Sequence, residues 1–166
     1  EYPGSFRIIL VDDDSSDGTA LIATRAAAFA PNRLIEVGSE GPPRGWAGKI
    51  WAVKQGIASA EELQPEYLLL TDADIVHAPD TLAWLVKQAR AGGFVLTSLM
   101  AKLRCESFAE RTHVPAFIYF FQMLFPFSWV SKPQASTAAA AGGCMLVRAD
   151  ALANAGGLAS IRNALI

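Results

Sequence analysis

Charged residues are scarce in this sequence, and neither sign is in clear excess. Of the 166 residues 18% are charged, and 14 basic residues stand against 16 acidic ones, which gives a net charge of −2. Proteins that bind nucleic acid through their overall charge are usually strongly basic. The composition therefore gives no reason to expect nucleic acid as a partner. The high share of hydrophobic residues, 52%, indicates strands buried on both faces or a surface that contacts lipid.

Cysteine is rare as well, and one familiar glycine pattern is missing. Cys105 and Cys144 are the two cysteines, and they lie far apart in the sequence. Two such thiols make neither a disulfide framework nor a zinc site, so we interpret both as core or near-core thiols of a reducing compartment. No G-x-G-x-x-G turn follows the first apolar run, which disfavours a dinucleotide-binding enzyme.

Apolar runs and helical patterns alternate along the chain. Continuous apolar runs of this kind predict buried strands, and they cover residues 7–11, 34–37, 67–71, 94–99 and 144–148. The alternation predicts one domain over residues 1–166, with a three-layer α/β/α, Rossmann-like fold and a mainly parallel sheet.

The helices between these strands carry recognisable faces. Asp17 is a candidate N-cap for a first helix that runs through Ala30, and a second helix is expected to begin near Lys49. The side chains that share one face of each of the first three helices are Ile22, Ala26 and Phe29; Ile50, Val53 and Ile57; and Leu82, Leu85, Val86 and Ala89.

Two predicted strands end in aspartates, at Asp12-Asp13 and at Asp72-Ala73-Asp74. Ligands of open α/β sheets bind beyond the carboxyl ends of the strands, so we expect these carboxylates to converge on one crevice. Clustered carboxylates are costly unless a cation neutralises them, and oxygen ligands suit Mg²⁺ or Mn²⁺ held together with substrate phosphates. The alternative is that these residues only form turns and caps, which applies above all to Ser15, Ser16 and Asp17.

Residues 114–130 carry no charge and are rich in aromatic side chains. A helix needs about 20 apolar residues to cross a bilayer, and Pro115 and Pro126 are expected to interrupt this segment. We therefore expect no spanning helix. Two interpretations stay open, a buried helix and a segment that lies on the membrane surface.

Four motifs resemble those of one enzyme family, the family 2 glycosyltransferases. The stretch 11–19 (VDDDSSDGT) resembles their V-D-D-x-S-x-D-x-T signature, and 71–74 (TDAD) resembles their D-x-D element. Together with 45–49 (GWAGK) and 142–148 (GGCMLVR), they are most similar to the ceramide-glucosyltransferase-like branch and its bacterial hopanoid-associated members.

This resemblance implies a GT-A fold and an inverting transferase that moves a hexose from a UDP-linked nucleotide-diphosphate donor with the help of a divalent cation. Asp13 would contact the uracil and Asp12 would support its loop. Asp72 would contact the ribose, Asp74 would hold the Mn²⁺ or Mg²⁺ ion, and Lys49 would lie near the phosphates. The branch further implies a lipid acceptor and a place at the cytoplasmic face of the bacterial inner membrane. It leaves the sugar, the acceptor and the oligomeric state open.

The sequence departs from the family pattern at the catalytic base. The family carries this carboxylate in a later acidic motif, followed by a Q/R-x-x-R-W element, whereas no acidic residue follows Asp150 here. A strand that usually precedes the first motif is also missing. We therefore expect the base beyond Ile166 in a longer protein, and these 166 residues alone to be inactive.

Other readings compete with the glycosyltransferase. A phosphorelay receiver domain would use Asp12-Asp13 as its acidic pair and Asp72 as phospho-acceptor, with Thr97-Ser98 and Lys132-Pro133 as its remaining marks. The spacing from Asp13 to Asp72 is long for that fold, and Asp74 would have no role. A haloacid-dehalogenase-like phosphatase would use Asp12 and Asp14, but a later Gly-Asp-x-x-x-Asp motif is missing.

Three further features each have a functional and a structural interpretation. Trp46 would either stack on a sugar or lipid or pack within its own loop. His77 would be a metal neighbour or, as we prefer, a surface histidine. Gly142-Gly143 would allow close approach of an acceptor or form a tight turn.

Overall fold

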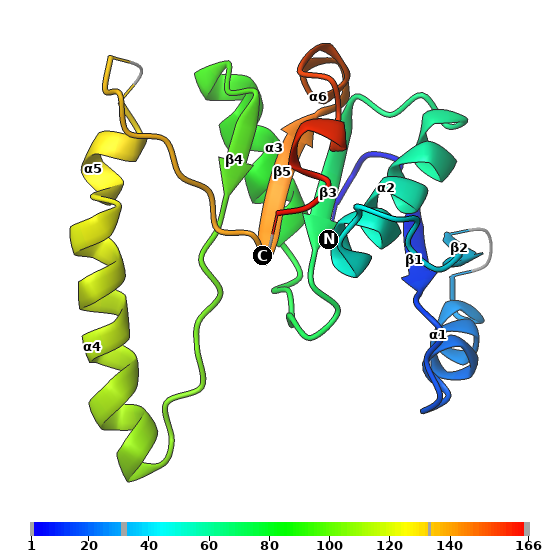
Figure 1. Cartoon of the computed structure of the whole chain (residues 1–166), viewed down its shortest axis with the longest axis horizontal. Helices are drawn as coiled ribbons and strands as arrows, with labels where there is room; N and C mark the ends of the chain where they lie inside the picture. Colours follow the sequence, from blue (N-terminus) through cyan, green and yellow to red (C-terminus); the bar gives the residue numbers. More distant parts are fainter. Residues whose placement is uncertain (1, 31–32, 133, 165–166) are drawn as a thin grey trace. The chain divides into compact units, whose positions relative to one another are not determined.

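The structure is a computed structural model, and it describes residues 2–30, 33–132 and 134–164 (Figure 1). Strands and helices alternate along most of the chain, as the sequence predicts. The elements are β1 (Ile8–Asp12), α1 (Thr19–Ala27), β2 (Leu34–Gly38), α2 (Gly48–Glu61), β3 (Tyr67–Thr71), α3 (Thr81–Gly92), β4 (Leu96–Ser98), α4 (Phe108–Leu124), α5 (Phe127–Val130), β5 (Cys144–Arg148), α6 (Ala149–Asn154) and the 3₁₀ helix η1 (Ala159–Ile161).

The chain divides into two compact units. Unit 1 consists of Glu1–Leu70, Val76–Thr97 and Leu146–Ile166, and unit 2 consists of Thr71–Ile75 and Ser98–Met145. Each unit is described by itself below. The expectation of a single domain over residues 1–166 stays a prediction.

In unit 1, β1 and β2 form a parallel pair whose register runs from Ile8 opposite Leu34 to Asp12 opposite Gly38. Helix α2 packs on this pair, and Gly56 makes the approach possible. A Cβ on Gly56 would lie only 2.8 Å from Cγ2 of Val11, closer than real Cβ contacts occur, and valine is stiff at χ1. The lack of a side chain at Gly56 therefore lets α2 lie directly against β1.

A second sheet has the strand order β3-β5-β4. The amide of Ala149 donates to the carbonyl of Glu66 and that of Asp72 to Gly143, so the residue number rises on β3 as it falls on β5. The pairs Arg148 with Val95 and Leu99 with Cys144 show the same reversal on β4. Strand β5 therefore runs antiparallel to both neighbours, which refines the prediction of a mainly parallel sheet.

The buried core side chains agree largely with the helical patterns. Leu85, Val86 and Ala89 of α3 are buried, as is Ile50 of α2, while Leu82, Val53 and Ile57 are half-buried. Leu146 and Val147 of β5 are buried as well. Cys144 is buried, and burial raises the pKa of its thiol.

Cys105 corrects the prediction that both thiols are core residues. It is exposed in the segment that precedes α4. Its neighbours Arg104 and Glu106 pair with one another through Arg104 Nη2 and Glu106 Oε2 at 2.7 Å, in contact with solvent. A polar segment of this kind keeps its backbone near water, and the thiol remains exposed with it.

Helix α1 is shorter than predicted, and its larger hydrophobic residues face outward. It ends at Ala27 rather than Ala30, and Ile22 and Phe29 are 65% and 93% exposed. The half-buried residues of α1 are Thr19, Ala20, Ala23 and Ala27, so the side of the helix that faces the strands carries small side chains. Thr24 also donates a hydrogen bond from its hydroxyl to Glu36 of β2.

In unit 2, α4 begins at Phe108 and continues past Pro115, so this proline lies inside the helix instead of interrupting it. Ser107 explains the earlier start, because its hydroxyl accepts from the Glu110 amide at 3.2 Å while Glu110 accepts from the Ser107 amide at 2.8 Å. Pro126 does interrupt the segment, between α4 and α5. Among the described residues, none of the helices is both long and apolar enough to cross a bilayer.

The interpretation of 114–130 as a buried helix is also corrected. Neither α4 nor α5 contains a buried residue. Phe120 and Trp129, for example, are more than half exposed.

Candidate functional site

The first acidic strand end is a structured turn at the carboxyl end of β1. The Asp12 carboxylate accepts a hydrogen bond from the Ser15 amide at 3.0 Å, and the Asp12 carbonyl accepts from the Ser39 amide at 2.8 Å. Asp14 adopts a left-handed φ of 59°, which aspartate tolerates better than most residues. The side chain and backbone of Asp12 thus hold the turn that carries Asp13.

Asp13 extends from this turn to the beginning of α2. Its Oδ2 lies 3.8 Å from the position that a Cβ on Gly48 would occupy, and Gly48 is the first residue of the helix. The N-cap of α2 is Ala47, whose side chain has no hydrogen-bonding group. Helix N-termini attract negative charge, so Asp13, Gly48 and Lys49 form one polar edge in unit 1.

The loop before α2 is held by its own contacts, and Trp46 takes part in them. Its ring lies 5.2 Å from that of Trp51 in an edge-to-face arrangement, and Lys54 Nζ lies 5.0 Å from the Trp46 ring and 4.8 Å from the Trp51 ring. The Trp51 indole also donates to the Glu40 carbonyl at 2.7 Å. These contacts support packing within the loop as the role of Trp46.

Gln55 anchors the same loop, although no sequence motif marks it. Its Oε1 accepts from the Glu40 amide at 3.0 Å, and its Nε2 donates to the Ser39 hydroxyl at 2.9 Å. These partners lie 15 and 16 residues away in the sequence, so only the three-dimensional structure shows that Gln55 contacts them.

The second acidic strand end is a tight turn in unit 2. The Ile75 amide donates to the Asp72 carbonyl at 3.3 Å, which places Ala73 and Asp74 at the tip of the turn, where Asp74 is exposed. The Asp72 amide donates to the Gly143 carbonyl at 3.0 Å. Asp72 is thereby attached to the turn that precedes β5.

Gly142 and Gly143 lie in that tight turn, which supports its structural interpretation. The Cys144 amide donates to the Ala141 carbonyl at 3.4 Å across the turn. A Cβ on Gly143 would meet Ile75 Cδ1 at 2.9 Å and Asp72 Oδ2 at 3.5 Å, whereas one on Gly142 would meet nothing within 4 Å. Gly143 thus leaves room for the Asp72–Ile75 turn.

The remaining polar candidates have local roles. The N-cap of α1 is Gly18, with φ 81°, rather than Asp17, because glycine adopts this left-handed conformation without strain. Asp17 accepts instead from the amide and hydroxyl of Thr19, and the hydroxyl bond, followed by the amide bond, lowers its pKa. His77 is exposed, as we preferred.

The aspartate turns offer carboxylate oxygens, which are the donors that a divalent cation prefers. Among the described residues, no group of three or more histidine, cysteine, aspartate or glutamate side chains is placed to hold an ion. Mg²⁺ is usually held by one or two carboxylates together with substrate phosphates and water. The exposed carboxylate of Asp74 fits that kind of site.

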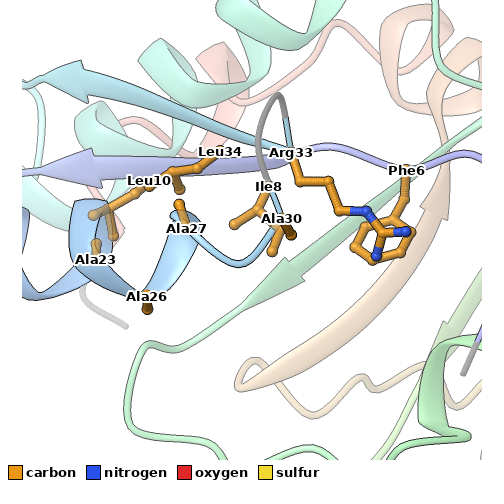
Figure 2. A pocket seen from close by; sticks show the side chains of 9 residues that line it. All are labelled: Phe6, Ile8, Leu10, Ala23, Ala26, Ala27, Ala30, Arg33 and Leu34. Atoms are coloured by element: carbon orange, nitrogen blue, oxygen red, sulfur yellow. The ribbon is translucent and has the colours of Figure 1, made fainter.

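An apolar cavity of about 340 Å³ lies elsewhere in unit 1 and contains none of the predicted site residues (Figure 2). Its lining includes three alanines of α1, Ala30 just beyond that helix, and Ile8, Leu10 and Leu34. Arg33 and Phe6 are part of the lining and contact one another, with the guanidinium 4.6 Å from the ring centre. The cavity offers no carboxylate or nucleophile, and we assign it to the loose packing of α1 on the strands.

Comparison with known proteins identifies the family. A protein-family model described as glycosyl transferase family 2 matches residues 2–156 of the sequence. The chain therefore belongs to this family, has its GT-A nucleotide-sugar transferase fold, and is a glycosyltransferase that uses a nucleotide-sugar donor. The match excludes a phosphorelay receiver as the identity of the chain. No curated protein and no solved structure matched it.

The site residues are divided between the two units. Asp12, Asp13 and Lys49 belong to unit 1, and Asp72 and Asp74 belong to unit 2. Their convergence on one nucleotide stays a prediction, and so does a base beyond Ile166, which lies outside the described residues.

Proposed function

We propose that this chain binds a UDP-hexose with a divalent cation and belongs to an inverting, ceramide-glucosyltransferase-like or hopanoid-associated enzyme that glycosylates a lipid hydroxyl. The observation that carries the proposal is the pair of aspartate turns, one at the carboxyl end of β1 and one at that of β3. In α/β sheets this is where ligands bind. The enzyme would act at the cytoplasmic face of the bacterial inner membrane.

In this proposal each of the two aspartate turns contacts a different part of the nucleotide-sugar donor. Asp13 would contact the uracil from the turn that Asp12 holds, and Lys49 would contact phosphate oxygens at the beginning of α2, where the helix dipole also favours negative charge. Asp72 would contact the ribose. Asp74 would hold Mn²⁺ or Mg²⁺, and the ion would stabilise the charge that develops on the leaving diphosphate.

Transfer of the sugar further requires a carboxylate that deprotonates the acceptor hydroxyl. We assign this role to none of the described residues. The proposal is therefore that residues 1–166 bind donor and do not turn it over.

Isothermal titration of the chain with UDP, in the presence and absence of Mn²⁺, tests the proposal. We expect Mn²⁺-dependent binding that Asp74→Ala abolishes. Glu62→Ala is the matched control, because it removes an exposed carboxylate at the other end of α2. UDP binding that is indifferent to Mn²⁺ and to Asp74→Ala would refute the metal assignment. Absence of UDP binding, with phosphorylation of Asp72 by acetyl phosphate, would overturn the donor site altogether.

A further inference from the structure

Helices α4 and α5 of unit 2 expose an unusual number of large hydrophobic side chains. Six of them, each between 52% and 66% exposed, define what we call the α4–α5 surface: Phe117, Tyr119, Phe120, Met123, Leu124 and Trp129. Large exposed apolar side chains gathered on neighbouring helices mark a site of interaction. Figure 1 shows α4 as one continuous helix that leads into α5.

These side chains project from more than one side of α4. Successive residues of a helix are rotated by about 100°, so Phe120 and Leu124 share one side, while Tyr119 lies on nearly the opposite side from Phe117. A rigid protein surface would cover one side of such a helix. The headgroup–acyl boundary of a bilayer is fluid and can adapt to apolar side chains on several sides of a partly embedded helix, which favours lipid as the partner.

The charges of the segment that contains α4 and α5 favour an anionic partner. Residues 98–145 contain four basic and two acidic residues, a net charge of +2, whereas Asp72 and Asp74 bring unit 2 as a whole to zero. Arg104 forms ion pairs with both acidic residues of this segment, with Glu106 at 2.7 Å and with Glu110 at 4.0 Å. Arg111 and Lys132 then stand at the two ends of the uncharged stretch 114–130.

The dimensions fit a helix that lies in the plane of the membrane rather than across it. Helix α4 has 17 residues, a length of about 25 Å, whereas a spanning helix needs about 20 apolar residues. Phenylalanine, leucine and tryptophan side chains that enter the acyl boundary, with basic residues at the headgroups, are the features of interfacial helices.

We propose that the α4–α5 surface docks this protein onto an anionic lipid bilayer, with its aromatic side chains below the headgroups and Arg111 and Lys132 beside lipid phosphates. The inference rests on the proposed function in one respect, that the acceptor is reached at a membrane. It adds the part of the chain that makes the contact and the charge of the lipid.

Flotation with vesicles tests this docking directly. We expect the 166-residue chain to float with vesicles of phosphatidylcholine and phosphatidylglycerol, and to be released by salt, because surface attraction falls off within a Debye length. Vesicles of phosphatidylcholine alone should bind it more weakly. Absence of flotation with the anionic vesicles overturns the proposal, and so does equal binding to both kinds of vesicle.

Matched variants locate the contact. Replacing Phe120 by serine should weaken the partition by about tenfold, since an exposed phenylalanine would otherwise be transferred out of water. Lys132→Gln should weaken it about fivefold. Phe29→Ser is the control, because Phe29 is exposed in unit 1, just after the end of α1, and it should have no effect. An equal loss in Phe29→Ser would overturn the assignment to α4–α5.

Two measurements keep the result independent of misfolded variants and of the donor site. In the unmodified chain, bromine-labelled lipids should quench tryptophan fluorescence, and Trp129→Phe should remove most of that quenching. Sedimentation velocity without lipid distinguishes a second copy of the chain as the partner, and concentration-dependent self-association without vesicle binding refutes docking. UDP titration without vesicles reports the donor site alone, so flotation can fail while UDP binding persists.

Discussion

A carboxylate oxygen of Asp13 lies 3.8 Å from the point where Gly48, the first residue of α2, would carry a Cβ. The strand end that the sequence marks as acidic therefore meets the positive end of a helix in the same unit. This neighbourhood gives Asp13 a structural role in addition to the proposed contact with the nucleotide base. The two roles can be separated by experiment.

Asp13→Asn should lower the free energy of unfolding only slightly, by about 0.3–1 kcal/mol, the usual contribution of a charge near a helix terminus. Its effect on uridine and UDP affinity should be larger and similar for both ligands. Urea denaturation and titration calorimetry measure the two quantities. Glu62→Gln removes a charge at the C-terminal end of α2, where the dipole has the opposite sign, so stability should rise slightly. A loss of stability in both variants would contradict the dipole argument.

Gly143 and Gly142 provide a second matched pair. Gly143→Val should shift the Asp72–Ile75 turn, because even a Cβ at this position would lie 2.9 Å from Ile75 and 3.5 Å from the Asp72 carboxylate. Overpacking of this kind costs about 1–3 kcal/mol, and we expect Mn²⁺-dependent UDP binding to weaken with it. Thermal unfolding and UDP titration are the measurements.

The control for that pair is Gly142→Val, whose Cβ would meet nothing within 4 Å. It should leave the unfolding temperature and UDP affinity nearly unchanged. The variant Gly143→Val combined with Ile75→Ala should recover part of the lost affinity. If both glycine variants behave alike, the turn contact is not what positions Asp72.

Much of the architecture could be predicted from local patterns. The strands and the buried face of α3 follow from apolar runs and from helical spacing, because these depend on which residues must leave water. The outward face of α1 could not be predicted in this way. Ile22 and Phe29 have the right spacing for a buried stripe, but the small residues Ala23 and Ala27 face the strands instead, where they line the apolar cavity.

Other features depend on contacts that are distant in sequence. The antiparallel direction of β5 is set by its pairing with β3 and β4 after a long connection, and a strand pattern carries no sign of direction. The beginning of α4 was readable, since Ser107-x-x-Glu110 is a capping-box pattern. The aspartates of the site were named from motif and position, and their convergence stays a prediction because it joins residues of two units.

The capping box of α4 should make its first turn sensitive to acid. Hydrogen bonds from the Ser107 and Glu106 amides, followed by that of the Ser107 side chain, lower the pKa of Glu110. A carboxylate with a lowered pKa stabilises the folded state above its unfolded pKa, and this contribution is lost as the pH falls through the folded pKa. The protection of the Ser107 amide, which is its exchange rate compared with the intrinsic rate at the same pH, should therefore fall in that acidic range.

Glu110→Gln is the control for this pH dependence, because glutamine can also accept in a capping box but does not titrate. The exchange rate at Ser107 should then vary with pH only as the intrinsic chemistry of exchange does. The same acid-dependent loss of protection at Ser107 in Glu110→Gln would show that another group controls the first turn.

Lys49 is the second residue of α2 and lies beside Gly48, on the same polar edge as Asp13. If it contacts donor phosphates, Lys49→Gln should weaken UDP binding by about tenfold or more, since hydrogen bonds to charged groups contribute about 1.5–3 kcal/mol. Uridine, which has no phosphate, should bind Lys49→Gln and the unmodified chain alike.

Lys54→Gln is the matched control: Lys54 contacts Trp46 and Trp51, so its loss should disturb the loop and affect uridine and UDP equally. This contrast separates a phosphate contact from loop support, because only a phosphate contact changes the ratio of UDP to uridine affinity. An unchanged ratio in Lys49→Gln would remove Lys49 from the donor site.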